Sequence, residues 1–100
     1  MKFLISWTVR PGIEGVEESK KAMQVFGKWS PDPSITFHQF VQRTDGSGGY
    51  AFVETDNAKA MLRDALTFGT WFDFQAIPVV DMLDAASVQQ EVIDLIESIV

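Results

Sequence analysis

Two side chains near the middle of the chain carry groups suited to proton transfer, His38 and Glu54. His38 is the only histidine, and an imidazole changes charge near neutral pH, so it is a candidate general base or ligand contact. Glu54 stands between Val53 and Thr55 in an apolar segment, where burial would favour the protonated carboxyl group and suit proton exchange. Each has a purely structural alternative: a histidine hydrogen-bonded on a sheet face, and a carboxylate that is solvated or paired with an arginine.

The composition argues against several other kinds of site. With one histidine and no cysteine, the chain cannot form a typical zinc site, a disulfide or a thiol nucleophile, and we expect no metal and no cofactor. A net charge of −6 disfavours nucleic acid and anionic membrane surfaces as partners. The first apolar run is too short for a signal peptide and no run reaches transmembrane length, so we expect a cytoplasmic location. The glycines at 46–49 precede a strand and lack Gly-Lys-Ser/Thr, which indicates a turn instead of a phosphate loop.

The hydrophobic pattern predicts seven elements within one domain, residues 1–100. Alternating and β-branched segments predict strands at 2–9, 34–43, 50–55 and 71–80, with Pro78 marking an edge or a bulge. Helical spacing predicts helices at 13–29, 58–66 and 84–99. Thr55 or Asp56 is the expected cap of the second helix, and Gly69 its expected left-handed stop.

The order β-α-β-β-α-β-α defines the expected fold. It predicts an α+β protein with the ferredoxin-like βαββαβ arrangement, a four-stranded antiparallel sheet and an extra C-terminal helix. Helices on one face of such a sheet leave the other face uncovered, and an uncovered apolar face in a soluble protein usually meets a partner. A second copy of the same chain, packed with two-fold symmetry, is the simplest partner, so we expect a homodimer.

The hairpin turn decides which residues share the uncovered face. A three-residue turn at Gly46, Ser47 and Gly48 is favoured because it gathers apolar residues, including Val41, under the helices. The same preference for an apolar side under the helices assigns Phe3, Ile5, Val9 and Trp7 to it. We expect the three-residue turn to place Tyr50 opposite Gln42, Phe52 opposite Phe40 and Glu54 opposite His38. A two-residue or four-residue turn would send His38 and Glu54 to opposite faces. The expected ligand-binding residues on the uncovered face are Ser6, Thr8, His38, Phe40, Gln42, Tyr50, Phe52, Glu54 and Gln75.

Three segments resemble a known family. They are Lys-Phe-Leu-Ile-Ser-Trp-Thr-Val at 2–9, the segment 45–56 with Gly-Gly-Tyr-Ala-Phe-Val-Glu-Thr-Asp, and the segment 71–80 with Asp-Phe-Gln-Ala-Ile-Pro-Val-Val. Together they are similar to the DUF3303 family, which resembles the dimeric α+β barrel superfamily. The resemblance implies two ferredoxin-like units packed sheet to sheet, and it implies no activity. Family members often carry a Trp-His pair late in the second strand, where this chain has Val41 and Gln42, with His38 earlier.

Three functions remain open from the sequence. The first is a homodimeric domain that binds a small, partly apolar molecule inside the barrel. The second is a cofactor-independent enzyme of monooxygenase or isomerase type, in which His38 or Glu54 transfers a proton; this hypothesis depends on analogy of fold. The third is a structural or regulatory dimer whose interior is filled by side chains.

Overall fold

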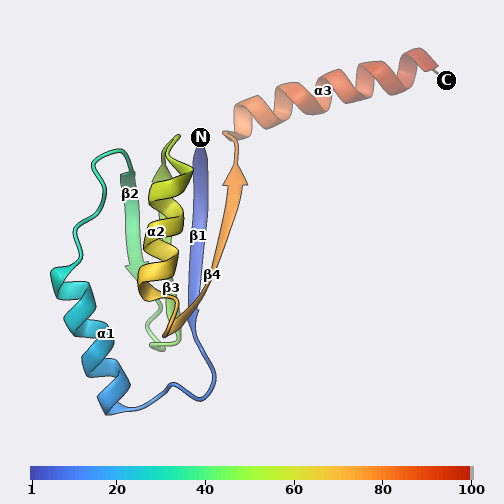
Figure 1. Cartoon of the computed structure of the whole chain (residues 1–100). Coiled ribbons are helices and arrows are strands. Elements are labelled where there is room, and N and C mark those ends of the chain that lie inside the picture. Colours follow the sequence, from blue (N-terminus) through green and yellow to red (C-terminus); the bar gives the residue numbers. More distant parts are fainter. Residues whose placement is uncertain (100) are drawn as a thin grey trace.

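A computed structural model describes residues 1–99 and contains four strands and three helices (Figure 1). Val100, the last residue of the predicted domain, lies outside the described residues. The elements follow the predicted order β-α-β-β-α-β-α: β1 Lys2–Val9, α1 Val16–Lys28, β2 Thr36–Gln42, β3 Gly48–Glu54, α2 Ala58–Phe68, β4 Phe72–Val79 and α3 Met82–Ile99.

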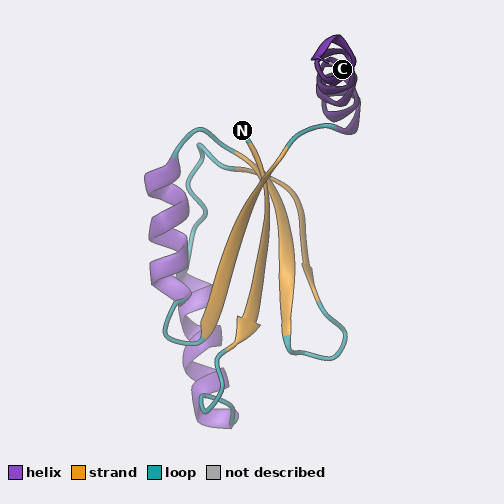
Figure 2. Ribbon diagram, turned by 90° about the vertical axis from the view of Figure 1, so that its right-hand side faces the viewer, coloured by secondary structure: helices purple, strands orange, loops and turns teal. Residues whose placement is uncertain are grey.

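The four strands form one antiparallel sheet in the order β2-β3-β1-β4. Inserting β3 between β1 and β2 splits the first βαβ unit, which is the ferredoxin-like arrangement, so the predicted α+β fold is confirmed. Both α1 and α2 lie on one side of the sheet, and the opposite side carries no helix among the described residues (Figure 2). We call these the helix face and the open face. β4 is an edge strand, as Pro78 indicated.

The core is small and lies where α2 packs on β3. Its buried members are Ile35, Ala51, Val53 and Ala60, and Val53 is fully buried. Phe3, Ile5 and Trp7 of β1 pack against them, which confirms the predicted assignment of these three side chains to the helix face.

The hairpin between β2 and β3 differs from the prediction. The N–H of Arg43 donates to the carbonyl of Gly48 at 2.8 Å, so the loop has four residues, 44–47. Val41 pairs with Tyr50 and Phe40 with Ala51, one residue away from the expected register. A three-residue loop at Gly46–Gly48 would itself pair Tyr50 with position 44, so the expected turn and the expected pairs were also inconsistent with each other.

A β-bulge at His38 returns its side chain to the same face as Glu54. The four-residue loop alone would have put the two side chains on opposite faces. Phe37 pairs with Val53 and Gln39 with Phe52, which leaves His38 as the extra residue. A bulge places two residues of one strand against one residue of its neighbour and re-aims a side chain. The prediction that a four-residue turn separates His38 from Glu54 is therefore wrong, because the bulge adds a second shift.

The local signals at the ends of α2 also differ from the prediction. Asn57, and not Thr55 or Asp56, is the N-cap: its side-chain oxygen accepts the N–H of Ala60 at 3.0 Å. Thr55 holds the segment before it, since its hydroxyl accepts the N–H of Asn57 and donates to the carbonyl of Ser34, both at 2.9 Å. Gly69 ends the helix with right-handed dihedral angles, φ −65° and ψ −17°, so the expected left-handed stop is wrong.

Helix α3 projects away from the sheet, beyond the end of β4 (Figure 1). None of its described residues is buried. Its apolar side chains are correspondingly exposed, from 38% at Ile93 to 82% at Leu83. The open face of the sheet and the apolar side chains of α3 are thus both without cover within residues 1–99.

Candidate functional site

The pair predicted to carry chemistry, His38 and Glu54, is formed on the open face. His38 Nε2 and Glu54 Oε1 lie 3.1 Å apart, within hydrogen-bond distance. Glu54 ends β3, and the bulge in β2 turns His38 toward it. The imidazole also lies beside Phe52, with ring centroids 5.5 Å apart. The side chains are 41% and 49% exposed, so the desolvation that the sequence argument required of Glu54 is absent from a single chain.

The neighbouring strand β1 brings a cation to the same end of the open face. Lys2 pairs in register with Glu54, and its ammonium group donates to Asp81 at 2.7 Å. The hydrogen bond to Asp81, followed by the negative charges of Asp81 and Glu54, raises the pKa of Lys2 against the opposing effect of desolvation. This end of the open face therefore holds one lysine, one histidine and two carboxylates.

Five further predicted residues lie on the open face. The register aligns Ser6 with Tyr50 and Gln75, Thr8 with Gly48 and Asp73, and Leu4 with Phe52 and Ile77. Residues paired across antiparallel strands point to the same face, so these side chains form one surface. The residues that share it with His38 and Glu54 are Ser6, Thr8, Tyr50, Phe52 and Gln75.

Phe40 and Gln42 were assigned to the open face, and that placement is wrong. They pair with Ala51 and Gly49, which face the helices. Phe40 makes an edge contact with Trp7, with ring centroids 5.5 Å apart, and both Phe40 and Gln42 line a cavity under the helices. Val41 takes the opposite place: it pairs with Tyr50 and belongs to the open face.

The helix face carries a cavity that sequence reasoning missed. It has a volume of about 390 Å³ and lies between the sheet and the two helices α1 and α2. Its lining comes from all four strands and both helices, with Ala51 as the contribution of β3. The walls are mainly aromatic: Trp7, Phe26, Trp29, Phe37, Phe40, Phe68, Phe72 and Phe74. The eight phenylalanines and three tryptophans were the available signal, but their number alone predicts only core packing.

Gly49 leaves room for Trp7, which lines the cavity, to pack against β3. A Cβ at Gly49 would overlap the indole ring of Trp7 and the carbonyl oxygen of Val41. The missing side chain lets the indole of Trp7 lie directly over β3. Trp7 is thereby held on the helix face, at the border of the cavity.

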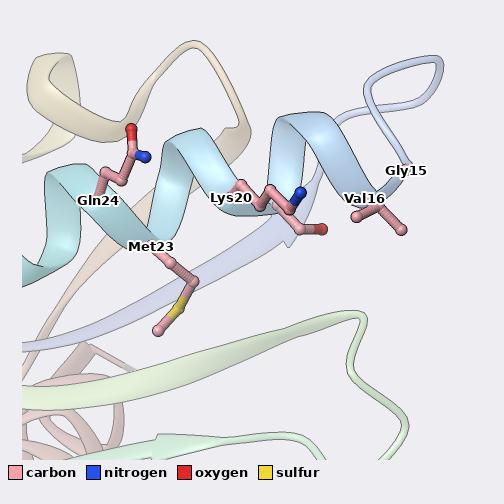
Figure 3. A pocket seen from close by; sticks show the side chains of 6 residues that line it. Gly15, Val16, Lys20, Met23 and Gln24 are labelled. Carbon is pink, nitrogen blue, oxygen red and sulfur yellow. The ribbon is translucent and has the colours of Figure 1, made fainter.

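A second hollow lies along α1 (Figure 3). It is broad and open, with a volume of about 600 Å³, and Figure 3 shows Val16, Lys20 and Met23 along its helical wall. Lys20 is already near Glu17, at 3.5 Å. An open hollow with one paired lysine provides little that could orient a ligand.

Two observations limit the chemistry further. Within residues 1–99, no group of three or more histidine, cysteine, aspartate or glutamate side chains is placed to hold a metal ion. No described helix is long and apolar enough to cross a membrane. The cytoplasmic location expected from the sequence stays a prediction.

The fold and the open face define a ferredoxin-like α+β protein with an uncovered sheet. Comparison with protein families gives a match over residues 1–93 to DUF3303, described as a domain of unknown function, and the chain belongs to that family. The resemblance identified from its sequence is thus confirmed. No curated protein matches the chain in sequence. The family brings no assigned activity, so the function must be argued from the site.

Proposed function

We propose that the protein is a homodimer in which the open faces of two sheets pack together and enclose a small, partly apolar molecule. The observation that carries the proposal is the open face itself, which exposes large apolar side chains around the His38–Glu54 pair. Leu4, Tyr50 and Ile77 are 37%, 41% and 47% exposed. A surface of this composition supports a partner, and a second copy supplies one with the same surface.

The area of the open face suggests that α3 takes part in the dimer. Four strands about 4.8 Å apart and about 26 Å long present roughly 500 Å² of planar area. A stable interface needs about 800 Å² from each partner. An 18-residue helix is about 27 Å long and about 10 Å wide, so one side of α3 would supply roughly the missing part.

The spacing of the apolar residues in α3 supports the same conclusion. Ala85, Val88, Val92, Leu95 and Ile99 alternate at intervals of three and four, which is the spacing of a helix that packs along its length on another surface. Its four charged side chains, all acidic, are Asp84, Glu91, Asp94 and Glu97. In the proposed dimer this stripe packs on the partner chain.

The polar groups of the open face set the class of ligand. Packing two sheets together would remove water from His38 and Glu54 and strengthen their interactions with an enclosed molecule. Ser6, Gln75 and the hydroxyl of Tyr50 would add a few hydrogen-bonding groups among aromatic and aliphatic walls. This combination suits a small molecule with an apolar body and one or two polar groups.

A second candidate function is proton transfer, and the His38–Glu54 hydrogen bond favours it. When His38 Nε2 carries the hydrogen and donates to Glu54, the other ring nitrogen, Nδ1, is free to accept a proton from a substrate. Glu54 would then hold the imidazole in that tautomer, as a carboxylate does in hydrolytic triads. In this reading the enclosed molecule is the substrate of a cofactor-independent enzyme. The third reading, a dimer with a filled interior, makes the opposite prediction for ligand binding.

The test combines ligand binding with turnover. Ligand-observed NMR on a panel of small aromatic and lactone compounds should detect binding to the wild type, weakened at least several-fold by Glu54→Gln. The control Glu14→Gln removes the same charge outside the sheet and should bind like the wild type. Absence of binding by the whole panel would support the filled interior and contradict the proposal. Equal turnover by the wild type and Glu54→Gln would remove Glu54 from any mechanism.

A further inference from the structure

The cavity on the helix face differs from the open face in one respect that points to a ligand: its charge. Among residues 1–99, Asp64 is the only charged residue that lines it, and no lysine or arginine does. Asp64 Oδ1 accepts the indole N–H of Trp29 at 3.0 Å, which fixes the carboxylate at the junction of α1 and α2. No other hydrogen bond or ion pair to Asp64 is found within residues 1–99, so the carboxylate can still accept from a ligand.

The rings around that carboxylate form a cluster in which two of the phenylalanines are partly exposed. Trp29 makes edge contacts with Phe37, Phe40 and Phe68, with ring centroids 5.5–6.1 Å apart. Phe26 and Phe40 remain 45% and 46% exposed, although both line the cavity. Ring faces that are not covered by protein are negative in electrostatic potential and attract cations within about 6 Å.

We propose that this cavity binds a small organic cation, an ammonium group attached to an aromatic or aliphatic body. The rings would surround the apolar part, and Asp64 together with the ring faces would stabilise the positive charge. The volume of about 390 Å³ lies within the range of small-molecule sites, and the net charge of −6 draws cations toward the protein. This site lies on the opposite face of the sheet from His38 and Glu54 and does not depend on the proposed dimer.

The experiment compares three probes that share a phenyl ring and differ in charge. They are 2-phenylethylamine, 2-phenylethanol and 3-phenylpropionate, which are cationic, neutral and anionic at pH 7. Isothermal titration calorimetry of the full chain should rank the amine first and the carboxylate last. If the three probes bind equally, or if none binds, the proposal is wrong.

Two variants locate the binding. Asp64→Asn removes the charge but keeps an oxygen that can accept the N–H of Trp29. It should weaken binding of the amine about tenfold, or about 1.4 kcal/mol, and leave binding of the alcohol unchanged. Asp94→Asn removes the same charge from α3 and should leave all three affinities as they are. Equal losses of amine affinity in the two aspartate variants would assign the effect to net charge and contradict the proposed site.

A third variant fills the cavity without touching Asp64. Ala22 lines it from α1, and Ala22→Phe should abolish binding of both the amine and the alcohol. Far-ultraviolet circular dichroism and a thermal melt show that each variant is folded. Unchanged binding by folded Ala22→Phe would place the probes elsewhere, including on the open face, and would contradict the proposal.

Discussion

The two faces of the sheet each hold a nitrogen-bearing ring beside a carboxylate, but they place the pair in different surroundings. On the open face, His38 and Glu54 are 3.1 Å apart and about half exposed. On the helix face, Trp29 and Asp64 are 3.0 Å apart at the wall of an aromatic cavity. The helix face is partly covered by α1 and α2 within one chain, whereas the open face is covered only in the proposed dimer. The same kind of contact would therefore serve a site within one chain on the helix face and, in the proposed dimer, a site between two chains.

The largest expected effect comes from a charge at the centre of the open face. Leu4 lies between Phe52 and Ile77, and Leu4→Asp would bring two carboxylates together across a two-fold interface. We expect at least a hundredfold weaker dimerisation, measured by sedimentation equilibrium. Gln24→Asp adds the same charge on α1 and should leave the mass of the assembly in solution equal to that of the wild type. If the Leu4→Asp protein sediments as an assembly of the same size as the wild type, the open face is not the interface.

The second prediction concerns the packing of the helix face. In Gly49→Ala the new methyl group would overlap the indole of Trp7 and a backbone carbonyl, so the free energy of unfolding should fall by about 1–3 kcal/mol. Gly27→Ala is the matched control, because its Cβ meets open space on α1 and alanine favours a helix. Urea denaturation should show a loss for the first variant and a gain of up to about 1 kcal/mol for the second. A stable Gly49→Ala protein would mean that Trp7 does not lie against β3.

The third prediction concerns the loop that fixes the register of both faces. The hydroxyl and the N–H of Ser47, followed by the Arg43 guanidinium, lower the pKa of Asp45 to about 2. Because the folded pKa lies below the ordinary value of 3.8, the stability that Asp45 contributes is present above about pH 4 and is lost as the pH falls toward 2.

NMR titration of the Asp45 carboxyl carbon tests this arrangement. Ser47→Ala removes the hydroxyl donor and should raise the pKa of Asp45 toward 3.8 more than Arg43→Gln does. An unchanged titration in Ser47→Ala would mean that the four-residue loop is not held by Asp45.

The smallest effect is expected for the coupling of His38 with Glu54 in a protomer. An exposed ion pair contributes about 1 kcal/mol or less, so a double-mutant cycle with His38→Gln and Glu54→Gln in the Leu4→Asp background should give a coupling in that range. The same cycle in the dimer should give a larger value, because the pair loses its water. Equal coupling in both backgrounds would show that the pair stays solvated in the dimer.

The order of elements could be predicted from the sequence because it depends on local patterns. Alternation assigned Phe3 and Ile5 to the helix face, and helical spacing placed α2, since both signals lie within a few neighbouring residues. The bulge at His38 could not be predicted, because residues 35–42 contain no glycine or proline to mark it. The four-residue loop places Phe40 and Gln42 on the helix face, against the prediction, and the bulge then brings His38 back beside Glu54.

The cavity could not be predicted for a different reason. Its walls come from α1, α2 and all four strands, and its existence depends on how far α1 stands from the sheet. A helical pattern such as the spacing of Met23 and Phe26 predicts which side of the helix faces the sheet, but it does not predict how closely the helix and the sheet pack. The Trp29–Asp64 contact joins residues 35 positions apart and has no local signal.

The most direct test of the account is the reactivity of single cysteines. The natural chain has no cysteine, so each variant carries one thiol. Gln75→Cys lies on the open face and Ser19→Cys on α1, and both positions are exposed in a single chain. At concentrations that favour the dimer, alkylation of Gln75→Cys should be at least several-fold slower than that of Ser19→Cys, and the difference should vanish on dilution or in the Leu4→Asp background. Equal rates at every concentration would contradict the claim that a second chain covers the open face.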